Sequence, residues 1–230
     1  MTASPVILGI DATTGVCTVA LAVGDTIITR TTRQRQGQTR AVLAAADALL
    51  AEAGLGRTGV DAVACTRGPG GFTGVRVTTG VGQGLALGLD RPVVALSTLQ
   101  VVAETAWRND PTPTGTLVLL DARMGEVYGG LFRHPPTAEP GTLPVGDEWL
   151  GAPVCPPLPA GQWSGAGSGF AAWPAIADGA GLSAVNADCD PDIAAAMPLA
   201  RQRLAAGEAV AAAALEPVYL RNRVTHAQKR

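Results

Sequence analysis

One short pattern occurs twice in the chain, and it constrains the fold more than any other feature. Residues 8–22 and 118–132 each start with an apolar run, pass through Asp-Ala into a turn with a glycine, and end in a second run rich in apolar residues. Aligned without gaps, the segments are identical at four of fifteen positions, including Asp11 and Asp121. Two such runs joined by a turn are typical of a β-hairpin. The repeat therefore predicts a duplicated domain that begins with a hairpin.

The residues around the first copy predict a complete lobe. A third β-rich run at 26–32 extends the hairpin to a meander, and residues 38–53 carry apolar side chains at helical spacing, with Gly54 at the C-terminal cap. A buried strand at 60–66, a second helix at about 73–89 and a strand at 92–96 follow. We expect an N-terminal lobe at 1–100 and a C-terminal lobe at 101–230. The last helix, predicted within 191–210 and ended or kinked by Pro198, and the tail are expected to pack back on the first lobe.

Composition limits the possible functions. The formal net charge is −2, so the chain has no overall basic field for nucleic acid, and the basic segments 30–40 and 221–230 are either local anion patches or solvated surfaces. The four cysteines form no CxxC pair and there are only two histidines, so we expect no metal site and reduced thiols. The first residues do not resemble a signal peptide or a membrane span, which favours the cytoplasm and no membrane contact.

Eight glycines lie between Gly68 and Gly88. The turn "GPGGFTGVR" at 68–76 lacks the Lys-Ser/Thr pair of a P-loop, so it does not predict a phosphate cradle. Gly80, Gly84 and Gly88 are four apart and share one face of the second predicted helix. Each costs about 1 kcal/mol relative to alanine in a helix, so we expect a close approach by another helix. That helix is either 38–53 or one of another subunit.

Two other features suggest contacts. Arg76 lies near the start of the second helix, where the helix dipole disfavours a cation, so a salt bridge or an anion contact is expected unless it is a plain surface arginine. In the first turn, Asp11, Thr13 and Thr14 form a candidate cofactor-binding group that could face a nucleotide phosphate or its magnesium ion. An ordinary Asx or threonine turn explains the same residues equally well.

Several segments together resemble one family: "ILGIDATTGVCTVAL", "GPGGFTGVR" with "PVVALSTL", "LLDARMGEVYGGLF" and "EPVYLRN". In this combination and order the chain resembles the TsaB (YeaZ) family. The resemblance implies an α/β, actin-like (ASKHA) fold of two related lobes, each with a mixed sheet flanked by helices. It also implies a non-catalytic scaffold without a cofactor, which binds and activates TsaD, the enzyme that transfers threonylcarbamoyl to adenosine next to the tRNA anticodon. The ATPase TsaE would be a further partner, and tRNA would be met only through the complex.

By this resemblance, the two N-terminal helices form the TsaD interface, and the chain homodimerises through the same surface when alone. The expected interface residues are Val42, Ala46, Leu49, Phe72, Arg76, Gly80, Gly84 and Gly88. TsaD enzymes bind metal through histidines on the first helix, and the corresponding helix here has none. Gly71 stands where the family usually has a serine, and Gln38 where many members keep a histidine, so no role of that histidine is transferred.

Two other functions remain open from the sequence. An independent actin-like ATPase or small-molecule kinase would use Asp11, Thr13 and Thr14 on phosphate, but no second-lobe adenosine motif is evident. A peptidase is the third hypothesis, and the lack of metal-ligand spacing argues against it.

Overall fold

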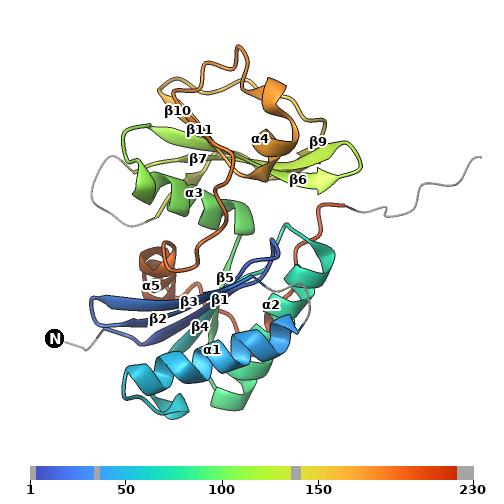
Figure 1. The fold of residues 1–230 in the computed structure, drawn as a ribbon. Helices are drawn as coiled ribbons and strands as arrows, with labels where there is room; N and C mark the ends of the chain where they lie inside the picture. Colours follow the sequence, from blue (N-terminus) through green and yellow to red (C-terminus); the bar gives the residue numbers. More distant parts are fainter. Residues whose placement is uncertain (1–3, 34–36, 136–140, 222–230) are drawn as a thin grey trace, which may run out of the picture.

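The chain folds into two lobes stacked one above the other (Figure 1). A computed structural model describes residues 4–33, 37–135 and 141–221. Each lobe is built on one mixed β-sheet with helices packed against it. Among the described residues, no helix combines the length and the apolar character that crossing a membrane requires.

The first lobe contains a five-stranded sheet in the order β3-β2-β1-β4-β5. Its strands are β1 (Ile7–Asp11), β2 (Cys17–Val23), β3 (Thr26–Thr32), β4 (Ala62–Thr66) and β5 (Val93–Leu96). The first three are antiparallel, as the predicted meander requires, and β4 and β5 run parallel to β1. Parallel strands need long crossovers, and two helices serve here: α1 (Gln38–Glu52), followed by the 3-10 turn η1 (Arg57–Gly59), and α2 (Phe72–Leu89).

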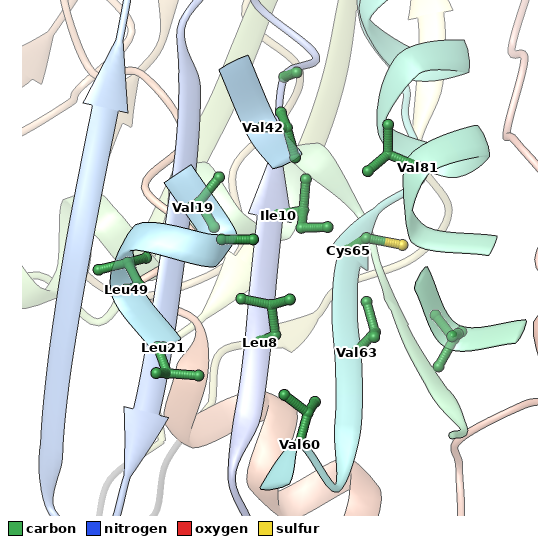
Figure 2. Packing of buried hydrophobic residues seen from close by; sticks show 14 of the residues in the cluster. Leu8, Ile10, Val19, Leu21, Val42, Leu49, Val60, Val63, Cys65 and Val81 are labelled. Carbon is green, nitrogen blue, oxygen red and sulfur yellow. The ribbon is translucent and has the colours of Figure 1, made fainter. Parts of the chain in front are cut away.

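Apolar side chains alternate along these strands and fill both faces of the sheet. On one face, Leu8 and Ile10 of β1 lie beside Val19 and Leu21 of β2 and pack against α1 and α2 (Figure 2). On the other face, neighbouring positions of the same strands, among them Ile7, pack against α5 (Met197–Ala205). Residues from the end of the chain therefore complete the core of the first lobe.

The second lobe repeats this arrangement in a six-stranded sheet. Its main path is β11-β10-β6-β7-β8, and β9 also pairs with β7. The strands are β6 (Gly115–Arg123), β7 (Glu126–Arg133), β8 (Leu143–Pro144), β9 (Trp149–Gly151), β10 (Trp163–Ala166) and β11 (Val185–Asn186). Helix α3 (Thr98–Asn109) packs on the sheet with α4 (Ser168–Ala172), which the 3-10 turn η2 (Pro174–Ile176) follows.

The two sheets share one topology, which confirms the predicted duplication. In each, a central strand pairs antiparallel with the strand that follows it and parallel with a later one: β1 with β2 and β4, and β6 with β7 and β10. The hairpin registers differ by one residue, because Leu8 pairs with Leu21 whereas Val118 pairs with Gly130 instead of Leu131. The second turn is thus one residue shorter, and the fold class is the α/β, two-lobed class that the sequence predicts.

The end of the chain differs from the expectation in one respect. Helix α5 spans nine residues, and Pro198 lies in its first turn, so the proline begins the helix and does not end or kink it. Proline is tolerated there because the first backbone N–H groups of a helix have no intrahelical acceptor. After α5 come the 3-10 turn η3 (Ala212–Ala214) and an extended segment that ends beside α2.

Candidate partner interface

An open groove runs along the outer surface of the first lobe between α1 and α2. It has a volume of about 670 Å³. The lining residues are Thr39 and Leu43 from α1, and Phe72, Thr73, Arg76, Val77, Gly80, Val81, Gly84 and Leu85 from α2. Phe72 is 55% exposed and Leu43 is 40% exposed, which is unusual for large apolar side chains. This surface is the leading candidate for a protein contact.

The glycine strip of α2 is part of this groove. A β-carbon placed on Gly80, Gly84 or Gly88 would meet no atom within 4 Å, so the strip faces open space. The prediction that this strip packs against residues 38–53 is therefore wrong. Helix α1 instead packs on the sheet through its own apolar stripe, which leaves the glycines available for a helix from outside the chain.

Three of the predicted interface residues are core residues. Val42, Ala46 and Leu49 are at most 3% exposed and pack in the first-lobe core. They lie on the stripe of α1 that faces the sheet, so they cannot touch a partner directly, and the expectation is corrected for them. The groove-facing residues of α1 are Thr39 and Leu43. Leu43 could have been found in the sequence as the large apolar residue that lies off the buried stripe.

At one end of the groove, Phe72 and Arg76 meet a residue from the end of the chain. The Arg76 guanidinium lies 3.6 Å from the centroid of the Phe72 ring, and Arg76 Nε donates a hydrogen bond of 3.0 Å to the Tyr219 hydroxyl. The two aromatic rings are 5.9 Å apart. Arg76 takes part in no ion pair among the described residues, so aromatic contacts replace the expected salt bridge. Sequence reasoning missed Tyr219 because its partners are more than a hundred residues away.

The glycines of the turn have a different role from those of the strip. A β-carbon on Gly74 would lie 2.1 Å from the carbonyl oxygen of Ala12, and one on Gly70 would lie 3.0 Å from that of Thr13. The backbone N–H of Gly71 donates a 2.9 Å hydrogen bond to the same Thr13 oxygen. The glycines thus let the start of α2 pack directly on the turn between β1 and β2.

This packing closes the predicted phosphate site. Asp11 has no exposed surface and Thr13 is almost fully buried. Thr13 and Thr66 donate hydrogen bonds to Asp11 Oδ1, while Asp11 Oδ2 and Thr14 Oγ1 are buried without a partner in the described structure. Burial raises the pKa of Asp11 from its ordinary 3.8 to about 6, although the threonine hydrogen bonds oppose that rise. Because Asp11 and Thr13 are turned inward, a phosphate cannot reach this group as the sequence hypothesis proposed.

The remaining titratable groups form no further site that we can assign. Within the described ranges, no three His, Cys, Asp or Glu side chains are placed to hold a metal ion together. His134 is buried, with Nδ1 2.7 Å from the Pro113 carbonyl oxygen and Nε2 2.9 Å from Thr116 Oγ1.

Taken with the repeated topology, these features define a class: a two-lobed α/β protein with an actin-like fold, a closed first turn and an exposed groove between its first two helices. A family model described as "TsaD: tRNA N6-adenosine threonylcarbamoyltransferase" matches residues 32–135. The protein named "tRNA threonylcarbamoyladenosine biosynthesis protein TsaB" in Escherichia coli is 36% identical over 228 residues, covering 95% of each chain. The protein of that name in Haemophilus influenzae is 34% identical and covers 95% of this chain and 94% of its own. The chain therefore belongs to the TsaB family.

Solved structures agree with this assignment. The structure "YeaZ from Pseudomonas aeruginosa" superimposes with a TM-score of 0.86 at 34% identity, covering 94% of this chain and all of the other. The similarity extends over both lobes, so the family assignment concerns the whole architecture and not one motif.

Proposed function

We propose that this chain acts in the biosynthesis of threonylcarbamoyladenosine in tRNA, as a non-catalytic subunit that binds and activates TsaD. The open, largely apolar groove between α1 and α2 is the observation that carries the proposal. The names of the curated relatives support the pathway. An exposed apolar groove in an otherwise well-buried lobe is typical of a surface that another protein covers.

The shape of the groove indicates how TsaD binds. Gly80 and Gly84 bring the backbone of α2 to the surface, so a helix of the partner can approach closely, while Leu43 and Phe72 supply apolar area on either side. The family model for TsaD matches a region that includes both α1 and α2. A contact between like helix pairs of two related subunits is therefore a natural geometry, and it also supports a homodimer through the same groove when TsaD is absent.

The other parts of the proposal follow from this role. The chain acts in the cytoplasm, with the ATPase TsaE as a further partner, and meets tRNA only through the complex. Helix α1 carries no histidine, whereas the resemblance places the TsaD metal ligands on the corresponding helix. The chemistry in this proposal belongs to TsaD, and this chain supplies a binding surface.

Reconstitution tests the proposal. The cognate TsaD and TsaE are supplied with threonylcarbamoyl-adenylate and tRNA, and threonylcarbamoyl transfer is measured with and without this chain. We expect transfer to depend on the chain, and the chain alone to hydrolyse no ATP. Equal transfer without it would contradict the activating role, and ATP hydrolysis by the isolated chain would favour the kinase or ATPase hypothesis.

A further inference from the structure

The last described residues, 215–221, form a strap that is fixed on the first lobe next to α2. Gln83 Nε2 donates a 2.7 Å hydrogen bond to the carbonyl oxygen of Leu215, and the Val218 N–H donates one of 2.7 Å to that of Arg67. Leu215 itself is buried in the first-lobe core. The strap therefore follows the groove-bearing helix and is held there by both side-chain and backbone bonds (Figure 1).

The far end of the strap is bonded to the second lobe. One guanidinium nitrogen of Arg221 lies 2.7 Å from Glu126 Oε2 and donates a 3.1 Å hydrogen bond to the carbonyl oxygen of Ala122. These partners flank the turn between β6 and β7. The Arg221 side chain is only 15% exposed, so this is a partly buried, charge-assisted contact and not a solvated ion pair. The strap thus joins the partner-binding helix of one lobe to the hairpin of the other.

Tyr219 lies between these two anchors and touches the groove. Its hydroxyl accepts the hydrogen bond from Arg76, and this bond orients the guanidinium that lies over the Phe72 ring. Phe72 and Arg76 both line the groove. A long arginine side chain on a helix surface samples many rotamers when free, so a fixed partner reduces the entropy that binding must remove.

We propose that the strap is a positioning device for the partner groove. Tyr219 holds Arg76 and Phe72 in the arrangement that the partner meets, and Arg221 holds Tyr219 in place by anchoring the strap to the second lobe. Partner affinity then depends on a contact between strap and second lobe that lies outside the groove. The inference rests on the proposed function, because it takes TsaD as the partner.

A double-mutant cycle in the full-length chain, with cognate TsaD as the probe in calorimetry, tests this role. Tyr219→Phe keeps the ring and removes only the hydroxyl that Arg76 uses. We expect it to weaken TsaD binding about fivefold to tenfold without a change in Tm. In an Arg76→Ala background the same substitution should have no further effect, because Tyr219 acts through Arg76. A role in stability alone would move Tm and would persist in that background.

Arg221→Gln tests the second anchor. It should weaken TsaD binding to a similar degree and speed hydrogen exchange at the Val218 amide, which the strap geometry protects. Arg57→Gln is the matched control, because it removes an exposed ion pair with Asp47 from the same lobe at a position that does not line the groove. The control should bind TsaD like the wild type.

The outcomes separate the two proposals. Unchanged affinity of Tyr219→Phe, or an equal loss with and without Arg76, would overturn the role of the strap while the groove proposal stands. If the wild-type chain did not bind TsaD at all, the proposed function would fail and the role of the strap would fail with it.

Discussion

Gly74 packs so closely on Ala12 that a β-carbon on Gly74 would lie 2.1 Å from the Ala12 carbonyl oxygen. Both groups belong to the backbone, so neither can rotate away as a side chain could. We therefore expect Gly74→Ala to push the start of α2 off the first turn and to lower the free energy of unfolding by about 3 kcal/mol, the upper range for overpacked sites. Urea denaturation followed by circular dichroism measures this.

Gly80→Ala is the control for that substitution. It makes the same chemical change in the same helix, but a β-carbon there meets no atom within 4 Å. Alanine is favoured over glycine inside a helix, so the variant should gain up to about 1 kcal/mol of stability. Equal stability of the two variants would show that the contact between Gly74 and Ala12 is not as tight as described.

Gly84→Leu tests the groove itself. A leucine side chain at this position would project into open space in the free chain and occupy the path of an approaching helix. We expect Tm to stay close to that of the wild type while affinity for TsaD falls more than about tenfold, a change of about 1.4 kcal/mol or more in binding free energy. Calorimetric titration with TsaD and the transfer assay measure both consequences.

Ala48→Leu serves as the matched control for the groove. Ala48 is exposed on α1 but does not line the groove. This variant adds a bulky side chain to the same lobe and should bind TsaD like the wild type. Retained TsaD affinity in Gly84→Leu would mean that TsaD uses another surface, and an equal loss in both variants would point to a general disturbance of the helix pair.

The strand order could be predicted from the sequence largely because the hairpin pattern occurs twice. Apolar runs and turn residues locate β1, β2 and β3, and the period of residues 38–53 locates α1 within a residue. Pro198 was misread because a proline both ends a helix and starts one, and the choice depends on whether the preceding residues are already helical. Here they form turns, so α5 starts at Met197.

The site was harder to predict because a helical period gives faces but not their surroundings. The stripe of Val42, Ala46 and Leu49 is apolar for the core, yet an interface would show the same spacing. The glycine strip was located correctly, but only the tertiary structure shows that its space is empty. Tyr219 joins Arg76 through the path of the strap, for which no local pattern in the sequence exists.

The cysteines should differ in reactivity. Cys65 is fully buried, and burial raises the pKa of its thiol to about 12, so very little thiolate is present at neutral pH. Cys155 is the one cysteine that the structure leaves partly exposed. Alkylation of the native chain with iodoacetamide, followed by peptide mass spectrometry, should modify Cys155 first and Cys65 only after unfolding. Early modification of Cys65 would show that the first-lobe core opens readily.

Asp11 should make the stability of the fold depend on pH. Its pKa in the folded chain is about 6, above the ordinary 3.8, because burial disfavours the charged form. Below both values the carboxyl is protonated in the folded and unfolded states, and its burial has no ionic cost. As pH rises through the folded pKa, the buried group must ionise, so this contribution to stability is lost. Between about pH 4 and about pH 7 the loss amounts to about 2 kcal/mol.

Asp11→Asn isolates this effect from other buried carboxyls such as Glu104, whose pKa burial also raises. The amide cannot ionise, and any cost of its unpaired polar atom is the same at every pH. The free energy of unfolding of the wild type, minus that of the variant, should therefore fall by about 2 kcal/mol from about pH 4 to about pH 7. Urea denaturation at several pH values measures it. A pH-independent difference would show that Asp11 keeps an ordinary pKa and that water reaches its unpaired oxygen, which would reopen the first turn as a binding site.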